Sequence, residues 1–454
     1  MTFVTGWGRT TPARADVWSP GGREEIAEAL AQPPPRGIVL RGLGRSYGDV
    51  ASNSGGLVLD LTGLTRVLAF DAEVGVVTVE AGLSLAALAD LVLPHGWFLP
   101  VSPGTRWVTV GGAIANDVHG KNHHVDGSFG HHVERLTLAT PRGEMLSLGP
   151  GSDEFDATVG GLGLTGAVLD ATIRLLRVES AEMTVDVETA SSLDGAIERL
   201  EATDASYRYS VAWIDTVSRG ARFGRGVLMQ GDHAPAGEAA PAPPPLDRPP
   251  RLSVPSRISA APALRSPALE VFNELYFRRA RPQRGRRESI PAFFYPLDAL
   301  GEWNRLYGSG GFLQYQFVVP HESVGLVGEI LGRLRAAGVR MPLTVLKRFG
   351  RSHGLIAFTG PGWTAAIDVA LPAPGLGPVL DEIDGLVADA GGSVYLAKDA
   401  RLRPDTLRRM LPRLDEWRRI RDALDPDRVL RSDLARRLHL VEDRQPLGVD
   451  NPQR

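Results

Sequence analysis

The sequence predicts an α+β fold of two domains, with the second domain inserted into the first. Short apolar runs flanked by glycine fill the first third of the chain, and 52 glycines and 34 prolines among 454 residues indicate many turns and much β-structure. From about residue 180 to 392, strand-like and helix-like segments alternate, which is typical of a mixed or antiparallel sheet backed by helices. The length allows two or three domains of roughly 150 residues each.

The first domain is expected to contain strands, a helix and a hairpin. The residues Leu85, Leu88, Leu91 and Val92 would share one face of the helix, and Pro94 would end it. The predicted elements are strands at 37–41, 56–62 and 75–82, a helix within 83–94, a hairpin over 133–148 and a long strand over 166–179.

The second domain is expected to hold longer strands and longer helices. Its predicted elements are strands at 183–190, 209–215, 312–320, 343–349 and 363–371, and helices over 321–337 and 375–390. A segment at about 231–268 is rich in proline and alanine and is expected to be a mobile excursion, because it lacks the apolar surface that would offset its ordering entropy. We therefore place domain boundaries at 1–178 and 179–392, with 393–454 returning to the first domain.

Composition limits the partners and sites that the protein can have. The 50 basic and 53 acidic residues give a net charge of −3, so no global field attracts nucleic acid or membranes. The sequence has no cysteine, which excludes disulfides, thiolate metal sites and a cysteine nucleophile. No apolar run approaches the roughly 18 residues of a membrane span, and the first residues lack the pattern of a signal peptide. We expect a cytoplasmic protein.

The stretch "RGLGRSYGD" at 41–49 has the glycines of an anion-binding turn. It does not fit the dinucleotide pattern G-x-G-x-x-G, because Tyr47 stands at a glycine position, and a strand-like run follows it where that pattern needs a helix. An anion would then be held by the amides of the turn itself. A tight turn without a ligand explains the loop equally well. The stretch "GLGLTG" at 161–166 does fit the pattern, but a helix precedes it and a strand follows, which argues against a Rossmann site.

Small residues and histidines crowd the segment 101–136. It holds His119, His123, His124, His131 and His132, five of the ten histidines. Glycines interrupt any helix that could align them, and no H-E-x-x-H occurs, so we predict no metal site. The segment is either a packed loop or the wall of a flat cofactor with titratable groups beside it.

Three motifs together resemble a known superfamily. "RGLGRSYGD", "VSPGTRWVTVGGAIANDVHGKNHH" and "GGLGLTGAV", in this order and spacing, resemble the PCMH-type FAD-binding domain of the vanillyl-alcohol oxidase superfamily. "HGKNHH", "FLQYQFVVP", "LTVLKRFG" and "YLAKDAR" resemble more narrowly the oxidase subunits of decaprenylphosphoryl-β-D-ribose 2-epimerases. The similarity runs from about residue 5 to 440.

The resemblance implies a two-part FAD-binding domain and assigns its cofactor residues. The 42–48 loop and 103–105 would hold the pyrophosphate, 111–116 would pass close to the flavin, and the "GGLGLTG" turn would contact the adenine half. The residues so assigned are Gly42, Gly44, Arg45, Ser46, Tyr47, Gly48, Pro103, Gly104, Thr105, Gly111, Gly112, Ala113, Asn116, His119, Val168 and Tyr395. Sugar and alditol oxidases of the superfamily often carry a covalently attached histidine where this chain has Arg45, so we predict non-covalent FAD.

The resemblance also implies the reaction, which is oxidation of the 2-hydroxyl of decaprenylphosphoryl-β-D-ribofuranose to a ketone. This would be the first half of epimerisation to the arabinose form used in cell-wall arabinan. An NADH- or NADPH-dependent reductase subunit would complete it. Lys398 and His119 are the catalytic candidates, and Lys398 would orient the hydroxyl, take its proton or stabilise reduced flavin.

Further residues are assigned to the substrate. Lys121 would meet the sugar phosphate, and Tyr47 and Lys347 would close the same wall together with Lys398. Gln314 and Gln316 lie two apart on one face of a predicted strand, where they would bind sugar hydroxyls or lie exposed. Thr364 and Ala366 replace an asparagine and a cysteine that are frequent in the family, which leaves strict substrate identity open.

The arginine-rich segment 277–287, "FRRARPQRGRR", has three possible roles. It could be a solvated loop, a surface for anionic lipid headgroups or a nucleic-acid site, and we favour the first two together, with peripheral contact at the inner membrane face and no nucleic acid. The alternative functions are a soluble sugar or alditol oxidase that passes electrons to oxygen, a UDP-sugar reductase, and a nucleic-acid binder with a vestigial flavin fold.

Overall fold

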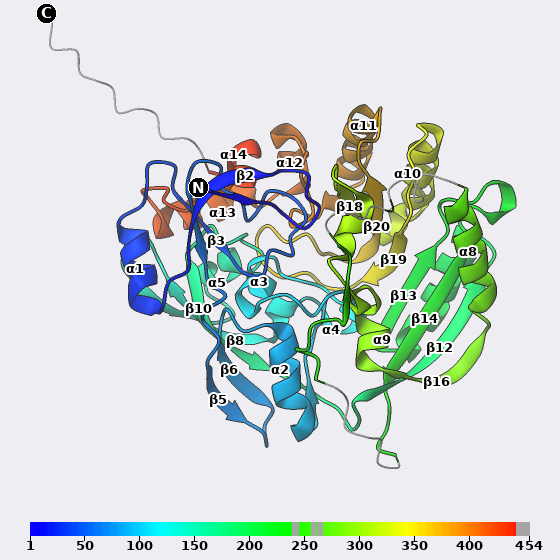
Figure 1. The fold of residues 1–454 in the computed structure, drawn as a ribbon, viewed down its shortest axis with the longest axis horizontal. Coiled ribbons are helices and arrows are strands. Elements are labelled where there is room, and N and C mark those ends of the chain that lie inside the picture. Colours follow the sequence, from blue (N-terminus) through cyan, green and yellow to red (C-terminus); the bar gives the residue numbers. More distant parts are fainter. Residues whose placement is uncertain (238–244, 256–259, 261–266, 442–454) are drawn as a thin grey trace, which may run out of the picture.

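The first domain contains two main sheets, which lie at the left of Figure 1. The computed structural model describes residues 1–237, 245–255, 260 and 267–441. The sheet orders are β1-β2-β4-β3 and β5-β6-β10-β8-β9. The strands are β1 (Thr2–Val4), β2 (Ala13–Trp18), β3 (Ile38–Arg41), β4 (Leu57–Asp60), β5 (Val67–Asp71), β6 (Val76–Glu80), β8 (Val133–Ala139), β9 (Met145–Leu148) and β10 (Ala167–Arg174).

Local sequence signals explain the helices of this domain. Helix α2 (Leu85–Val92) begins where the Ser84 hydroxyl accepts a hydrogen bond from the Ala87 amide. Of its predicted apolar face, Leu85, Leu88 and Val92 are buried and Leu91 is half-buried. The other helices are α1 (Arg23–Ala31), α3 (Val110–Ala115), α4 (His123–Asp126) and α5 (Asp153–Thr158), and a short ladder joins β7 (Trp97–Phe98) to β11 (Leu176–Arg177). The predicted hairpin is confirmed as β8 and β9, which pair in antiparallel fashion.

The second domain is built on one eight-stranded sheet, drawn in green to yellow at the right of Figure 1. Its order is β16-β12-β14-β13-β19-β20-β18-β21, and its neighbouring strands pair in antiparallel fashion. The strands are β12 (Glu182–Ala190), β13 (Tyr209–Ile214), β14 (Gly226–His233), β16 (Gln283–Ser289), β18 (Phe312–Val319), β19 (Thr344–Phe349), β20 (Gly362–Ala370) and β21 (Ser393–Val394).

The two faces of this sheet have different coverings. Helices α6 (Leu193–Thr203), α10 (Gly325–Ala336) and α11 (Leu376–Asp389) pack on one face and form the largest apolar core with it. Helices α8 (Ala268–Arg279) and α9 (Ile290–Phe294) share a second core with the other face and with α2, β6 and β8 of the first domain. This second face therefore turns toward the first domain, and it carries the functional residues described below.

The C-terminal segment packs on both domains. Strand β21 is an edge strand of the second-domain sheet, where it pairs with β18. Helices α12 (Pro404–Met410), α13 (Leu414–Leu424) and α14 (Asp433–Arg437) follow, and the indole of Trp417 donates a hydrogen bond to the Ala157 carbonyl of the first domain. Strand β21 therefore belongs to the second-domain sheet, α12 packs against the second-domain core, and Trp417 of α13 contacts the first domain.

Two segments expected to be irregular contain ordered structure. The arginine-rich segment 277–287 is the end of α8 followed by β16, which pairs with β12, so it is not a loop throughout. Within the Pro/Ala-rich segment, the amides of Leu246 and Asp247 donate hydrogen bonds to Asp90, and β15 (Leu252–Ser253) pairs with β17 (Leu300–Gly301). Residues 238–244, 256–259 and 261–266 of that segment lie outside the described residues.

Candidate active site

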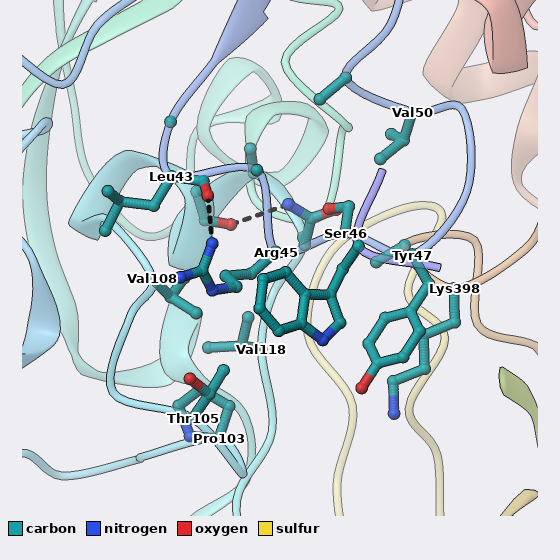
Figure 2. Close-up of a pocket in the computed structure, with 18 of the residues that line it drawn as sticks. Leu43, Arg45, Ser46, Tyr47, Val50, Pro103, Thr105, Val108, Val118 and Lys398 are labelled. Carbon is teal, nitrogen blue, oxygen red and sulfur yellow. Dashed lines mark hydrogen bonds between the residues drawn. The ribbon is translucent and has the colours of Figure 1, made fainter. Parts of the chain in front are cut away.

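A cavity lies between the glycine-rich turns of the first domain and the sheet of the second domain (Figure 2). The first domain contributes the turns 42–47, 103–105 and 162–166 and the start of α3. The second domain contributes side chains from β18, β19 and β20, and the segment after β21 contributes Tyr395, Ala397 and Lys398. In the described ranges no helix combines the length and apolar character needed to span a bilayer.

The 42–47 turn is held from both sides by backbone hydrogen bonds. The Trp7 amide donates to the Ser46 carbonyl at 2.8 Å, and the Tyr47 amide donates to the Ala397 carbonyl at 2.9 Å. Gly44 has a φ of 64°, a conformation that favours glycine. Within the described residues, no acceptor pairs with the backbone amides of 42–46, so they are available to an anion.

Arg45 has a fixed place at the edge of the cavity. Its guanidinium donates a hydrogen bond to the Leu43 carbonyl at 2.9 Å, drawn as a dashed line in Figure 2, and lies 4.2 Å from the centre of a Trp7 ring. Trp7 was not predicted as a site residue, because a lone aromatic near the N-terminus gives no sequence signal of its contacts.

The middle of the cavity is lined by small residues. Thr109 caps α3 by accepting a hydrogen bond from the Gly112 amide at 3.1 Å, and the Gly111 amide donates to the Ala81 carbonyl at 2.7 Å. A Cβ at Gly42 would lie 2.3 Å from the Thr109 hydroxyl oxygen, so the turn and the helix can approach only through glycine. Such surfaces let a flat ligand lie close to the backbone.

Lys398 and Tyr47 lie side by side at the second-domain end of the cavity (Figure 2). The Lys398 Nζ lies 5.5 Å from the Tyr47 ring centre and 5.9 Å from that of Tyr395. Burial, reinforced by the charge of Lys347, lowers the pKa of Lys398 to about 7. Burial also lowers the pKa of Lys347 to about 8. Both lysines can therefore exchange a proton near neutral pH.

His119 lines the cavity between Tyr395 and Phe349, with ring centres 5.0 and 4.9 Å away. Burial, then the charges of Lys347 and Lys398, lowers its pKa well below the ordinary value, so the imidazole is neutral. The Gln316 amide nitrogen lies 3.0 Å from Nε2. Because an amide nitrogen only donates, Nε2 accepts and Nδ1 carries the proton.

Four predicted site residues lie behind the lining. Gly48 packs against Asp399, and Ala113 is buried inside α3. Lys121 donates to the Phe293 carbonyl, with its Nζ 4.1 Å from the Phe293 ring centre, and burial followed by the charge of Lys347 lowers its pKa to about 7. Gln316 shares the face of Gln314 as expected, but it bonds His119 and Thr364 and does not line the cavity.

The remaining predicted residues line the cavity, together with some that sequence analysis missed. The predicted ones are Gly42, Gly44, Arg45, Ser46, Tyr47, Pro103, Gly104, Thr105, Gly111, Gly112, Asn116, His119, Val168, Gln314, Lys347, Tyr395 and Lys398. The missed ones include Trp7, Thr109, Leu297, Trp303, Leu343, Val345 and Ala397. Among the described residues, no group of three or more His, Asp or Glu side chains could hold a metal ion.

Asp368 lies directly behind this wall and is fully buried on β20. Its carboxylate accepts hydrogen bonds from the Tyr307 hydroxyl at 2.7 Å and the Gln314 amide at 2.5 Å. Burial raises the pKa of Asp368 to about 6, and its charge in turn raises that of Lys398. A buried aspartate in an otherwise apolar strand is a signal of a paired polar site, and sequence analysis did not use it.

Replacing Asp368 by asparagine is expected to shift the pH dependence of flavin reduction to lower pH. The carboxylate favours protonated Lys398, so its removal lowers the pKa of this lysine below about 7 and neutral lysine persists to lower pH. The measurement is the pH profile of the rate at which substrate reduces the flavin. The matched control is Asp384→Asn, which removes another carboxyl of pKa about 6 that bonds Tyr315 on the opposite face of β18. An unchanged profile for Asp368→Asn would contradict this.

Comparison with known proteins gives two kinds of match. Residues 16–149 match the family model described as FAD binding domain. The chain is 43% identical over 451 residues to the decaprenylphosphoryl-β-D-ribose oxidase of Mycolicibacterium smegmatis, covering 96% of this chain and 97% of that protein. It is also 32% identical over 169 residues to L-gulono-1,4-lactone dehydrogenase of Mycobacterium tuberculosis, covering 37% of this chain and 39% of that protein. Over 176 residues it is 30% identical to the alditol oxidase of a Streptomyces species, covering 38% and 42%.

Proposed function

This chain belongs to the same family as the decaprenylphosphoryl-β-D-ribose oxidase of Mycolicibacterium smegmatis, and from this premise we propose that it oxidises the 2-hydroxyl of a polyprenylphosphoryl-β-D-ribofuranose to a ketone. The observation that carries the proposal is the meeting, in one cavity, of a glycine-rich cradle with Lys398, Lys347 and Gln314. These side chains suit a carbohydrate because they can bind hydroxyl and phosphate oxygens.

Two observations indicate that the first-domain part of the cavity fits FAD. The unpaired amides of 42–46 suit a diphosphate, and a Cβ added at Gly104 would meet no protein atom within 4 Å, so the cavity is open there. The 42–47 and 103–105 turns would hold the diphosphate, and the small residues of α3 would lie against the flavin. When bound, FAD supplies the acceptor for the hydride that leaves the sugar carbon.

The protein's own residues would handle the proton and the orientation. Lys398, with a pKa of about 7, would take the hydroxyl proton, and Gln314, oriented by Asp368, would bind a neighbouring hydroxyl. Neutral His119 would keep Nδ1 as its one ring nitrogen without a partner among the described residues, because Gln316 occupies Nε2. Tyr47 and Tyr395 would exclude water beside Lys398.

The test is anaerobic mixing of the FAD-loaded protein with synthetic polyprenylphosphoryl ribose while flavin absorbance is followed. Bleaching of the flavin with this substrate, and not with free ribose, is the expected result. Bleaching by free sugars or alditols with rapid peroxide formation in air would replace the proposal by the alditol-oxidase alternative.

The flavin is expected to be held without a covalent bond. Arg45 occupies the predicted attachment position, where it bonds Leu43 and stacks on Trp7, and the sequence has no cysteine for another linkage. Precipitation of the FAD-loaded protein with acid should therefore release the flavin into the supernatant. A pellet that stays yellow and fluoresces on a denaturing gel would contradict this.

A reductase partner follows from the chemistry of the product. A 2-keto sugar becomes arabinose only if hydride is delivered to carbon 2 from the opposite face and a proton to the oxygen. A reductase partner would supply that hydride from NADH or NADPH. The ketone formed by this protein is expected to persist until such a reductase is added, as measured by mass spectrometry of the lipid-linked sugar.

Peripheral membrane contact would use the exposed arginines of 277–287. Within the part of the chain that the structure describes, Arg279, Arg281 and Arg284 form no ion pair, so they are free to meet anionic headgroups. Flotation with liposomes is expected to increase with the content of anionic lipid. Equal flotation with neutral liposomes would remove this part of the proposal.

A further inference from the structure

Two segments of the candidate active site meet at one side of the cavity. They are the turn 42–47, which is expected to hold FAD, and the segment 395–398, which ends at Lys398. The Tyr47 amide donates a hydrogen bond to the Ala397 carbonyl at 2.9 Å. This backbone contact joins the expected FAD site to the segment that carries the proposed base.

A buried aspartate follows each of these segments. Asp49 lies two residues after the turn and Asp399 directly follows Lys398, and their side chains are 7% and 4% exposed. The Asp399 Oδ1 accepts hydrogen bonds from the amides of Arg401 and Leu402 at 3.0 and 2.9 Å. The carboxylate therefore fixes the path of the chain just beyond Lys398.

Both aspartates pair with Arg437 at the end of α14. The Nε and Nη2 of Arg437 donate hydrogen bonds to the two carboxylate oxygens of Asp49, at 3.0 and 2.8 Å. Its Nη1 lies 2.9 Å from Oδ2 of Asp399 and donates a hydrogen bond to the Leu402 carbonyl at 2.9 Å. A lysine could not make this set of contacts, because its ammonium group lacks the planar fork of a guanidinium.

The positive charge of Arg437 offsets the repulsion between the two carboxylates. Burial raises the pKa of Asp49, the hydrogen bond and charge of Arg437 oppose this shift, and the charge of Asp399 adds to it. Removing the arginine would leave two buried carboxylates without the cation that lies between them. Such a loss costs much more than the pair itself contributes, and the two carboxylates would tend to move apart.

We propose that Arg437 is a positioning residue for the oxidation, because by holding Asp49 and Asp399 together it fixes Lys398 against the 42–47 turn. This inference rests on the proposed function and adds to it a residue outside the cavity. Arg437 does not line the cavity, so it acts through the two aspartates. A displacement of about 1 Å at a reacting group can lower a rate on the order of a hundredfold, so this support should affect the chemical step.

The second domain offers a matched control in Arg225, which also lies between two carboxylates. Its Nε donates a hydrogen bond to Oδ2 of Asp215 at 3.0 Å, and its Nη1 lies 2.8 Å from Oε2 of Glu274. Arg225 does not line the cavity either. Replacing either arginine by glutamine breaks the same kind of contact, but only Arg437→Gln should disturb Lys398.

The test compares Arg437→Gln with Arg225→Gln by denaturant unfolding, by titration of FAD into the FAD-free proteins, and by anaerobic flavin reduction with synthetic polyprenylphosphoryl ribose. Both variants should unfold at a lower denaturant concentration than the wild type. Only Arg437→Gln should bind FAD about tenfold more weakly and lower the limiting rate of flavin reduction at least about tenfold, with a smaller change in KM.

The pH profile of the limiting rate gives a readout that a loss of stability alone would not change. Burial, reinforced by the charge of Lys347, lowers the pKa of Lys398 to about 7. If Lys398 moves toward water in Arg437→Gln, burial lowers its pKa less, and the midpoint of the profile should rise by about one pH unit or more. The titratable groups that face Lys398 are the same in both proteins, namely Lys347, Asp368, Tyr47, His119 and Tyr395.

A second variant keeps the test decisive if Arg437→Gln does not fold. Asp399→Asn retains the Oδ1 acceptor for the Leu402 amide and removes only the charge that faces Arg437. It should also lower the limiting rate, and a wild-type rate would overturn the inference. Where both variants fold, the double variant should be no slower than Arg437→Gln, because both changes remove the same contact. Losses that multiply would show that the two residues act independently.

The remaining outcomes separate this inference from the proposed function. If Arg437→Gln matches Arg225→Gln in FAD affinity, limiting rate and pH midpoint, Arg437 only stabilises the fold and the inference is overturned. If the wild-type flavin is not reduced by the lipid-linked ribose, the proposed function itself has failed. In that case the FAD affinities of the two variants still decide whether Arg437 holds the 42–47 turn.

Discussion

Replacing Lys398 by methionine is expected to leave a folded, FAD-loaded protein whose flavin is reduced by substrate about a thousandfold more slowly. General base catalysis contributes on the order of 10²–10⁴ in rate, and Lys398 is the group that the structure places beside Tyr47 and Tyr395 with a pKa of about 7. The measurement is stopped-flow flavin absorbance under anaerobic conditions, with KM and the limiting rate determined separately. A variant that keeps the wild-type limiting rate would contradict the catalytic role.

The same variant makes a prediction about stability with a definite sign. The pKa of Lys398 is about 7 in the folded protein and ordinarily 10.5, so burial of the charge lowers the free energy of unfolding. This loss is complete below pH 7 and fades as pH rises to 10.5, where the lysine is neutral in both states. Lys398→Met should therefore stabilise the FAD-free protein most at and below pH 7, measured by denaturant unfolding. Destabilisation at pH 7 would show that Lys398 makes a net favourable contact.

Replacing Gly48 by alanine is expected to lower both stability and FAD affinity. A Cβ at Gly48 would lie 1.7 Å from the carbonyl oxygen of Asp399. This oxygen belongs to the backbone, which cannot move out of the way as the end of a flexible side chain can. We expect a loss of about 1–3 kcal/mol in the free energy of unfolding from this overpacking. Because the 42–47 turn and the segment 395–398 both line the cavity, FAD should bind at least tenfold more weakly.

The control for Gly48→Ala is Gly332→Ala in α10. A Cβ at Gly332 meets no atom within 4 Å, so alanine there should raise the free energy of unfolding by up to about 1 kcal/mol. Isothermal titration of FAD into the FAD-free proteins, together with denaturant unfolding, measures both effects. If Gly48→Ala binds FAD as tightly as Gly332→Ala does, the close packing of Gly48 against Asp399 is not needed to hold the 42–47 turn in its FAD-binding conformation.

The regular elements could largely be predicted from the sequence. The hairpin over 133–148 became β8 and β9, and the helix within 83–94 became α2, because local periodicity and Pro94 act within a few residues of the chain. The arginine-rich segment 277–287 was harder, since its strand β16 is exposed on both faces and lacks the alternation that identifies a strand. Only its pairing with β12 makes it one.

The residues of the site also divide into those that the sequence predicts and those that it does not. Gln314 and Gln316 share a strand face by their spacing alone, and the sequence predicted this. Which of the two reaches the cavity depends on His119, which approaches from the first domain and pairs with Gln316. Asp368 and Trp7 reach the site through partners far along the chain, at Tyr307 and Ser46, and no local pattern reports such contacts.

The sequence by itself determined the α+β elements and the glycine-rich turns, because these depend on residue types at fixed short spacings. The class of cofactor followed from the resemblance of these turns to a known superfamily. Tertiary structure alone decided which side chains face the cavity and how far burial lowers the pKa values of its lysines. These properties depend on the distance between residues far apart in the chain and on the water that packing removes between them.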